Sequence, residues 1–246
     1  MATAVESCVA QLERALFATS GRVSLDQVLE AVVDGALVGF GLKAATPPGT
    51  ELEKDAAPIR HQLLRGIREA PPFTDVLGPL YMSMRSTGKA RALGQWFTPQ
   101  PVAAFMNAIL LDGCSEVEPC DTRLRTMCDP CCGSGVQLLG AAAAIYRAGG
   151  REAVLRWSFT GIDLDNLCAK ITAFAILANA ALHGIPVGEL LVYRGNSLAA
   201  PDQWRVIVHA TAPQVPAAAV VPALAASRTR AIRNASLMLH EQLRLF

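Results

Sequence analysis

The sequence has little charge for its length and no excess of either sign. Of its 246 residues, 17% are charged and 52% are hydrophobic, and the formal net charge is +1. A nearly neutral chain has no long-range attraction to nucleic acid or to an acidic membrane surface, so such a contact needs a local patch or a partner. The high apolar content excludes wholesale disorder and predicts a sizeable core.

Two kinds of targeting segment are also missing. No apolar run is long enough to span a bilayer, so no membrane partner is expected. The first residues lack the basic start of a secretory signal and instead carry Glu6 and Glu13 in a helix-like pattern. These absences predict a cytoplasmic protein, in which the seven cysteines are reduced.

The cysteines do not form a complete metal-binding pattern. Cys128 and Cys131 have the spacing of two zinc ligands, but no second Cys-x-x-Cys pair follows them. Cys128 also falls inside a predicted strand. We therefore expect buried thiols that act as small hydrophobic side chains and no metal site, with zinc as the alternative interpretation.

Three regions follow one another along the chain. Residues 1–90 have helical spacing of apolar positions, with a predicted capping box formed by Ser24 and Gln27. Residues 91–213 contain strands that alternate with helices, which favours a mostly parallel sheet with helices on its faces. Residues 214–246 are rich in Ala and Pro and then return to a helical pattern.

The second region contains the sheet and its connecting helices. Asp165 is the predicted cap of one long helix, and Gly149-Gly150 is the predicted end of the other. The predicted strands cover 124–128, 157–162, 190–193 and 206–208, and the long helices cover 136–148 and 166–182.

A glycine-rich turn follows the first predicted strand. In Gly133-Ser134-Gly135, backbone N–H groups and the start of the next helix can face a ligand. A dinucleotide fingerprint would need a third glycine where Leu138 stands. The turn alone is therefore compatible with several nucleotide-like ligands, or with a tight turn between strand and helix and no ligand.

The residues around this turn carry a resemblance to a known family. Residues 129–135, Asp-Pro-Cys-Cys-Gly-Ser-Gly, resemble the Asp-Pro-x-Cys-Gly-Ser-Gly signature of amino-group DNA methyltransferases. They are most similar to the adenine-N6 branch of type I and related restriction–modification systems. The resemblance implies a Rossmann-like SAM-methyltransferase fold, with S-adenosylmethionine (SAM) as the cofactor. The implied contacts with its methionine part come from Asp129, Pro130, Gly133, Ser134 and Gly135.

A second motif lies upstream of the turn. Residues 94–99, Gly-Gln-Trp-Phe-Thr-Pro, resemble the family's Gly-Gln-Phe-aromatic-Thr-Pro motif, which implies that Phe97 and Thr98 touch the same part of the cofactor. From the residues themselves, Thr98 is the predicted cap of a helix and Pro99 its first residue. One apolar face of that helix is predicted from Val102, Phe105, Met106 and Ile109.

Further motifs keep the order found in the family. Residues 75–81 resemble the helical segment that leads into these enzymes. Asp163 ends the second predicted strand, where the family has an acid, and a carboxylate there can accept both ribose hydroxyls. Residues 195–197, Gly-Asn-Ser, resemble a Gly-Asp-Ser motif whose acid contacts the adenine amino group. Asn196 keeps an amide oxygen that can accept this hydrogen bond.

The family's acceptor-base motif is missing. The family grips the flipped adenine with (Asp/Asn)-Pro-Pro-aromatic after the fourth strand. Here that strand runs into a degenerate loop with His209, Thr211 and Pro213. Losing the positioned acceptors raises a barrier by about 3–6 kcal/mol. About 33 residues follow Pro213, which predicts a sheet truncated on its C-terminal side.

The chain ends in a short peptide with its own resemblance. Residues 242–246, Gln-Leu-Arg-Leu-Phe, resemble the peptide by which bacterial polymerases and repair proteins bind the sliding clamp. The implied contacts come from Gln242, Leu243, Leu245 and Phe246. The alternative is an amphipathic terminal helix that covers the core.

These observations leave three functions open. The first is an adenine-N6 DNA methyltransferase-like protein that binds SAM and DNA, the latter weakly when alone. Its methyl transfer would be impaired, or would depend on a completing subunit or a homo-oligomer. The second is a non-catalytic adaptor recruited to replicating DNA by its C-terminal peptide. The third is an RNA or protein methyltransferase with an unfamiliar acceptor loop, against which the DNA-type motifs argue.

Overall fold

Helices come first along the chain and a sheet follows. The computed structural model describes residues 4–19, 23–42, 47–85, 97–112 and 124–215. Within these ranges the fold is mixed α/β, with seven α-helices and one four-stranded sheet, as the strand–helix alternation predicts. Among the described helices, none combines the length and the apolar character that a bilayer crossing requires.

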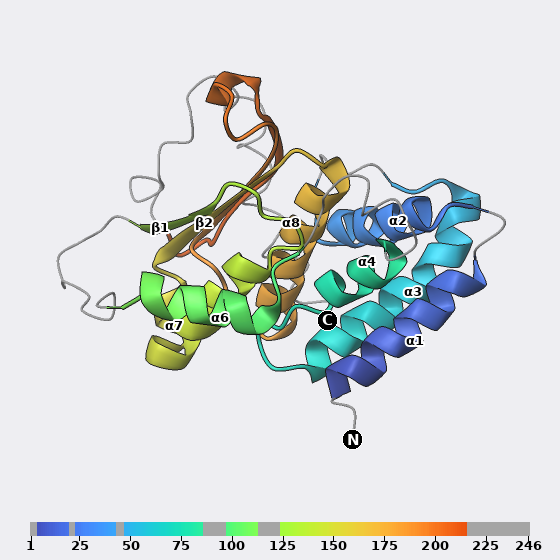
Figure 1. Ribbon diagram of the computed structural model, residues 1–246, viewed down its shortest axis with the longest axis horizontal. Helices are drawn as coiled ribbons and strands as arrows, with labels where there is room; N and C mark the ends of the chain where they lie inside the picture. Colours follow the sequence, from blue (N-terminus) through green and yellow to red (C-terminus); the bar gives the residue numbers. More distant parts are fainter. Residues whose placement is uncertain (1–3, 20–22, 43–46, 86–96, 113–123, 216–246) are drawn as a thin grey trace.

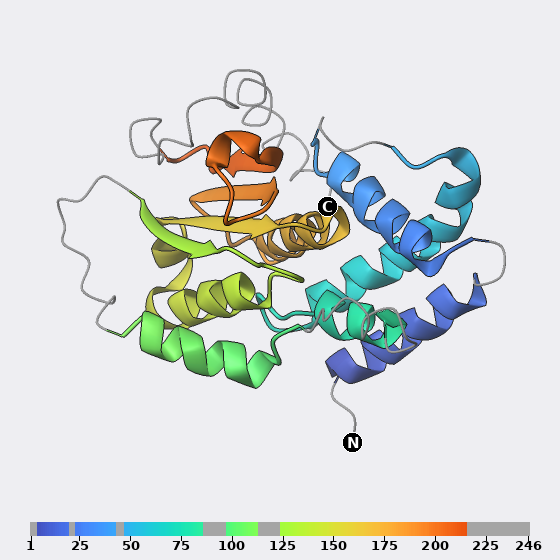
Figure 2. The ribbon, with the colours of Figure 1, turned by 45° about the horizontal axis from the view of Figure 1, so that its top comes forward.

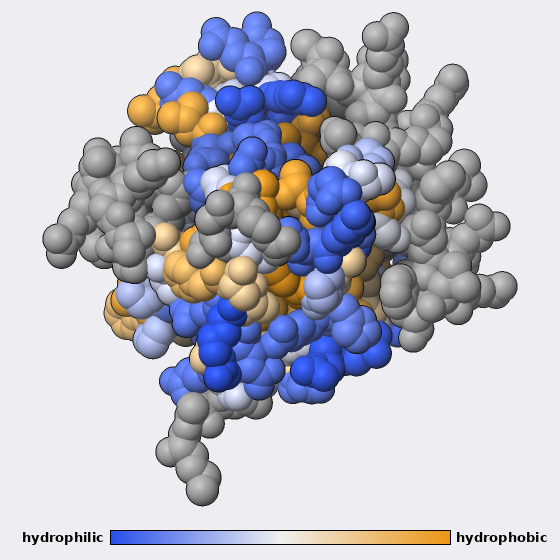
Figure 3. Space-filling model, turned by 90° about the vertical axis from the view of Figure 1, so that its right-hand side faces the viewer, coloured by the Kyte–Doolittle hydropathy of each residue, from blue (hydrophilic) through white to orange (hydrophobic). Residues whose placement is uncertain are grey.

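Four helices form the N-terminal region. They are α1 (Ala4–Ala18), α2 (Leu25–Gly39), α3 (Thr50–Glu69) and α4 (Leu77–Arg85). The predicted capping box at the start of α2 is confirmed, because the Gln27 N–H donates to Ser24 Oγ at 3.2 Å and Gln27 Oε1 accepts from the Ser24 N–H at 3.2 Å. On the face that Figure 3 shows, hydrophilic residues surround a smaller hydrophobic area.

The sheet region begins with a surface helix and then alternates strands and helices (Figure 1). Its elements are α6 (Gln100–Leu110), β1 (Arg125–Asp129), α7 (Val136–Val154), β2 (Trp157–Asp163), α8 (Asn166–Leu182), β3 (Glu189–Arg194), the 3₁₀ turn η1 (Pro201–Gln203) and β4 (Arg205–Thr211). Asp165 caps α8 by accepting the Leu167 N–H at 2.8 Å, as expected. The α7 helix runs past its predicted end, with a kink at Gly150, whose φ is 67°.

The sheet order is β1-β2-β3-β4, and its last strand differs from expectation. β1, β2 and β3 are parallel, but β4 is antiparallel to β3. β4 also continues to Thr211, so His209 and Thr211 are strand residues that pair with Leu191 and Glu189. The prediction that residues 209–213 form a loop after a short fourth strand is therefore wrong for residues 209–211. A connection through one 3₁₀ turn is too short for the crossover that a parallel neighbour needs.

Helix α8 joins the two regions. It packs on β2 and β3 and also against α2 and α3, so it lies between the sheet and the N-terminal helices (Figure 1). This explains why its sequence is apolar nearly all round, because a helix covered on both sides has no solvent face. The one basic residue of α8, Lys170, forms ion pairs with Glu30 at 2.7 Å and Asp34 at 2.8 Å, both on α2.

Helix α6 departs from its predicted start. The N-cap is Pro99 without a side-chain hydrogen bond, so the prediction that Thr98 caps the helix is wrong. The buried positions of α6 are Ala103 and Asn107, which face α7. The apolar face predicted from Val102, Phe105, Met106 and Ile109 is exposed.

A buried polar cluster joins the start of β3 to β4. Glu189 is fully buried; its Oε2 accepts from Ser158 Oγ at 2.7 Å, and its Oε1 lies 2.9 Å from His209 Nε2. A buried carboxylate without hydrogen-bonding partners is strongly destabilising, so both side chains are needed to keep Glu189 inside. His209 thus has a structural task at the buried end of β3.

Replacing His209 should therefore destabilise the fold. In His209→Ala the Glu189 carboxylate stays buried with one partner lost, and we expect the free energy of unfolding to fall by about 2–4 kcal/mol. In the double variant Glu189→Gln/His209→Ala the buried charge is gone, and part of that stability should return. Urea denaturation followed by circular dichroism measures both effects. An unchanged urea midpoint in His209→Ala would contradict this account of the cluster.

Candidate functional site

The carboxyl ends of three parallel strands bring several predicted site residues to one edge of the sheet. β1 ends at Asp129, β2 at Asp163 and β3 at Arg194, which is followed by Gly195 and Asn196. Parallel strands point the same way, so these ends lie side by side, and in α/β sheets such an edge is the usual place for a ligand. We call residues 129–135, Asp163 and Asn196 the carboxyl-edge site.

The centre of the carboxyl-edge site is a hydrogen bond between the glycine-rich turn and the second strand. The Gly133 N–H donates to Asp163 Oδ2 at 2.8 Å, while Asp163 Oδ1 accepts the Asp165 N–H at 2.8 Å. On the other side of the turn, Thr172 Oγ1 donates to the Gly133 carbonyl at 3.0 Å. The turn is thus attached to β2 and to α8 as well as to its own strand.

Two positions of the turn require glycine. Gly133 has a φ of 53° and Gly135 a φ of 85°, values that L-residues with a side chain rarely adopt. Space is short as well: a Cβ on Gly133 would lie 3.0 Å from Phe97 Cε1, and one on Gly135 would lie 3.1 Å from Thr172 Cγ2. The sequence therefore places glycine where the backbone itself must come close to its neighbours.

An aromatic stack supports the turn from outside. The ring of Phe97 lies against Gly133, and it stacks on Tyr81 of α4 with ring centroids 5.0 Å apart and planes inclined by 10°. Phe97 is half-buried, whereas its neighbour Thr98 is exposed. The upstream motif thus reaches the glycine turn through its aromatic residue.

A buried carboxylate links the turn to the N-terminal helices. Ser134 Oγ donates to Asp75 Oδ2 at 2.9 Å, and the Gly78 N–H donates to Asp75 Oδ1 at 2.8 Å. Both Asp75 and Ser134 are buried. Burial raises the pKa of Asp75 to about 6 against the lowering effect of its hydrogen bonds from Gly78, Ser134 and Leu77. The carboxylate of Asp75 therefore accepts hydrogen bonds from both the start of α4 and the glycine turn.

Two further carboxylates shape the electrostatics of the carboxyl-edge site. Burial is the main cause that raises the pKa of Asp129, and the negative charge of Asp163 raises it further. Burial likewise raises the pKa of Asp163, while the N–H groups of Asp165 and Gly133 lower it. Asp129 Oδ1 accepts the Cys131 N–H at 3.1 Å. A ligand that brings hydroxyl or ammonium donors would stabilise both acids in their charged form.

Asn196 lies beside this carboxylate pair. The Gly195 N–H donates to the Asp163 carbonyl at 2.8 Å, which fixes the end of β3 against the end of β2. Asn196 Oδ1 accepts the Leu198 N–H at 3.0 Å, and its carbonyl accepts from Trp204 Nε1 at 2.8 Å. Asn196 is exposed, so its amide can reach a ligand from the third strand end.

The donors and acceptors at this edge fit the groups of SAM. The first turn of α7 has no side-chain cap at Gly135, and its first intrahelical bond starts at the Leu139 N–H, so N–H groups before Leu139 face the edge. Such groups suit a carboxylate. Asp129 and Asp163 provide acceptors for an ammonium group and for ribose hydroxyls. The glycine turn gives close access to the backbone.

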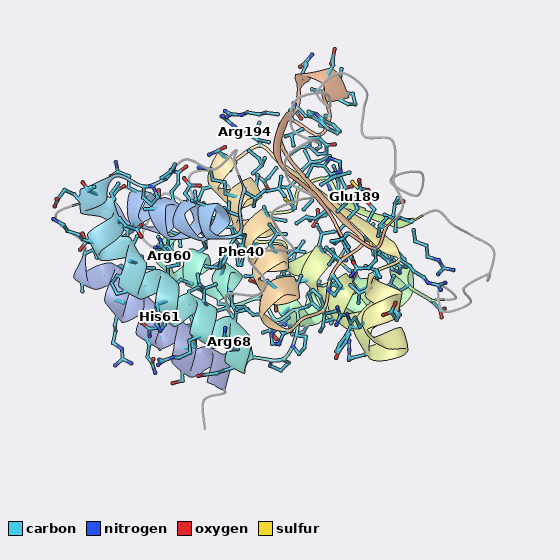
Figure 4. The ribbon with its side chains drawn as sticks, turned by 180° about the vertical axis from the view of Figure 1, so that it is seen from behind. Phe40, Arg60, His61, Arg68, Glu189 and Arg194 are labelled. Carbon is cyan, nitrogen blue, oxygen red and sulfur yellow. The ribbon has the colours of Figure 1, made fainter. Side chains whose placement is uncertain are left out.

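Other predicted site residues do not belong to the carboxyl-edge site. Because β4 runs opposite to β3, Thr211 is paired with Glu189, at the other end of β3 from Arg194 (Figure 4). His209 binds Glu189, and Pro213 is exposed beyond the strand. The predicted clamp-binding residues Gln242, Leu243, Leu245 and Phe246 lie outside the described residues.

No metal centre emerges among the described residues, where no group of three or more His, Cys, Asp or Glu side chains is arranged to hold a metal. Two shallow surface hollows lie in the N-terminal region instead. One, of about 250 Å³, is lined by Lys54, Asp55 and their neighbours, and the other, of about 270 Å³, by Phe40, Arg60 and His61 (Figure 4). Neither is lined by residues of the carboxyl-edge site.

Sequence reasoning missed the residues that support the turn. Thr172 gave a signal, because it is a lone hydroxyl inside an otherwise apolar stretch of α8. The hydrogen bond between Asp75 and Ser134 has no signal in the sequence, since 59 residues separate the two. The stack of Tyr81 on Phe97 is equally a matter of tertiary packing.

Comparison with known proteins adds one match. The family model described as N-6 DNA methylase matches residues 73–218, which include α4, the carboxyl-edge site and the whole sheet. No significant similarity was found to a curated protein or to a solved structure.

The ionisation of Asp75 gives a testable pH dependence. Its pKa is higher in the folded chain than the ordinary 3.8, so its contribution to stability is present below about pH 4 and is lost as the pH rises through about 6. Asp75→Asn keeps an acceptor for Gly78 and can donate to Ser134 without ionising. We expect its free energy of unfolding to exceed that of the native chain by an amount that grows from pH 4 to pH 7, to about 2–3 kcal/mol.

Urea titrations at several pH values measure this difference. The exposed Asp202→Asn provides the control and should follow the native chain at every pH. A stability difference for Asp75→Asn that does not change with pH would refute the role of this ionisation.

Proposed function

The chain belongs to the N-6 DNA methylase family, and on that premise we propose that it binds SAM at the carboxyl-edge site. The observation that carries the proposal is the hydrogen bond from the Gly133 N–H to Asp163. It joins the glycine turn and the acid of the second strand into one continuous surface. Bound SAM would supply an electrophilic methyl group.

Each side chain of the carboxyl-edge site has a task in this proposal. The N–H groups at the start of α7 hold the carboxylate of the methionine part, and Asp129 accepts from its ammonium group. Asp163 accepts from the ribose hydroxyls with the lone pairs that its hydrogen bonds from backbone N–H groups leave free. Asn196 offers its amide to the adenine, and Phe97 keeps water from the turn.

Methyl transfer by this chain alone is not part of the proposal. Transfer to the adenine N6 needs two acceptors for its amino protons and a stacking ring. Asn-Pro-Pro-aromatic or Asp-Pro-Pro-aromatic occurs nowhere in the sequence. His209 and Thr211 lie in β4, with Thr211 paired to Glu189 at the opposite end of β3, and Pro213 follows the strand. The proposal assigns the acceptor groups to a partner.

Titration of the purified chain with SAM in a calorimeter tests cofactor binding. We expect saturable heat with one site per chain. In Asp163→Asn the charge is removed and one of the backbone N–H groups loses its acceptor, so the dissociation constant should rise by on the order of 10–100-fold.

Asp202→Asn is the matched control, because it makes the same change at an exposed acid of η1, and it should bind as the native chain does. Circular dichroism verifies that Asp163→Asn is folded. Absence of heat with the folded native chain would remove the cofactor proposal.

Transfer of a radiolabelled methyl group from SAM to mixed-sequence DNA tests whether the chain alone can methylate. The purified chain should give background incorporation, because the positioned acceptors are worth about 3–6 kcal/mol of barrier. Clear incorporation into adenine would contradict the claim that this chain lacks the groups that position the adenine amino group. Incorporation into RNA or protein instead would favour the third function.

The adaptor function is the alternative if SAM does not bind. It rests on residues 242–246, Gln-Leu-Arg-Leu-Phe, which lie outside the described residues. In that case the fold would be a scaffold, and clamp binding would recruit it to DNA. Loss of retention on immobilised sliding clamp after deletion of Leu245 and Phe246, with SAM binding absent, distinguishes it from the cofactor proposal.

A further inference from the structure

The connection between β3 and β4 carries an arginine at each of its ends. Arg194 is the last residue of β3 and Arg205 is the first residue of β4, and the antiparallel register puts the two directly opposite each other. Both side chains are exposed. Like charges directly opposite on neighbouring strands destabilise the strand pair. The stability of the sheet therefore does not explain why two arginines stand here.

No acid among the described residues neutralises this arginine pair. Asp163 is in register with Arg194 on the β2 side, but its two oxygens accept the N–H groups of Gly133 and Asp165. Within the described ranges, neither Arg194 nor Arg205 forms an ion pair or a hydrogen bond through its side chain. Two uncompensated positive charges thus face solvent at one end of the sheet.

Hydrogen bonds inside the connection fix its shape and leave an apolar side chain outside. Trp204 Nε1 donates to the Asn196 carbonyl at 2.8 Å, and the Leu198 N–H donates to Asn196 Oδ1 at 3.0 Å. Trp204 also packs on Gly195, where a Cβ would lie 2.6 Å from its Cδ1. Leu198 is nevertheless 94% exposed. The connection therefore presents a large apolar side chain to solvent between the two arginines.

We call residues 194–205 the arginine hairpin. Figure 1 shows that this hairpin stands out from one end of the sheet, beyond the helices. Figure 4 shows Arg194 toward that end and Glu189 farther along the same strand. Strands that enter one of the grooves of DNA are a known means of binding a duplex, and a protruding hairpin has the shape that this requires.

We propose that the arginine hairpin binds duplex DNA, with Arg194 and Arg205 on phosphates and Leu198 in the minor groove. The phosphates supply the negative charge that the arginine pair lacks, and the guanidinium group is well suited to bind them. Apolar side chains such as leucine are often inserted into the minor groove of DNA. The wide and shallow minor groove of an RNA duplex fits such a side chain less well.

The binding is expected to be weak and local. The net charge of the whole chain is only +1, so the hairpin receives little help from the remaining surface. Two phosphate contacts give a slope of about −1.8 in a plot of the logarithm of the association constant against that of the salt concentration. We expect a dissociation constant of about 10–100 µM at low salt.

Fluorescence anisotropy of a labelled mixed-sequence DNA duplex, titrated with the full chain at several salt concentrations, tests the proposal. Arg194→Ala/Arg205→Ala should raise the dissociation constant by about 10-fold or more at low salt and should remove most of the salt dependence. Leu198→Ser should raise the dissociation constant by about 3–10-fold and leave the salt slope unchanged, because no charge is removed.

The matched control is Arg14→Ala/Arg68→Ala, which removes the same charge from exposed positions of α1 and α3. It should bind as the native chain does. Circular dichroism verifies that all three variants are folded.

Each outcome decides for or against the proposal. A native chain that does not bind the duplex up to several hundred micromolar at low salt overturns it. A control that loses as much affinity as Arg194→Ala/Arg205→Ala shows that only total charge matters, which also overturns it. An RNA duplex that binds as tightly as DNA excludes the minor-groove placement of Leu198. The titration contains no SAM, so its failure and a failure of cofactor binding are told apart.

Discussion

The hydrogen bond between the Gly133 N–H and the Asp163 carboxylate is the constraint on which the carboxyl-edge site depends. It spans the gap between the ends of β1 and β2 at 2.8 Å and uses the backbone of a residue that must be glycine. A side chain at that position would meet the ring of Phe97 and would need an unfavourable φ. The turn, the acid and the aromatic residue therefore constrain one another.

The N-terminal helices are part of this arrangement. Asp75 holds Ser134 from the start of α4, and Tyr81 of the same helix stacks on Phe97. Helix α8 lies between the two regions, and its Thr172 binds the carbonyl of Gly133. One continuous apolar cluster includes residues from α1 to β4. The N-terminal helices and α8 therefore contact the glycine turn and its aromatic neighbour directly.

Local patterns in the sequence were sufficient for most of the elements. The cap at Asp165, the capping box at Ser24 and the strand that ends at Asp163 follow from residue types within a few positions of one another. The glycine turn was predictable because its backbone demands glycine. The adenine-N6 methyltransferase resemblance, which depends on several such motifs in order, is supported by the family match over residues 73–218.

Tertiary contacts account for what the sequence did not reveal. The reversed direction of β4 has no local signature, because a strand has the same alternation whichever way it runs. His209 therefore looked like part of a loop, although it binds the buried Glu189. The apolar face of α6 was predicted from its spacing, but its exposure was not, since periodicity says which residues share a side and not what covers it. The roles of the cofactor residues and the division into three regions remain predictions.

The central claim is that the glycine turn and the second-strand acid together form the surface on which SAM lies. Two-dimensional ¹H–¹⁵N NMR of the chain labelled at glycine, recorded with and without S-adenosylhomocysteine, tests it most directly. The account predicts that the amide signals of Gly133, Gly135 and Gly195 shift on saturation, while those of Gly150 and Gly184 stay in place. Unchanged signals for Gly133 and Gly135 in the presence of bound ligand would contradict it.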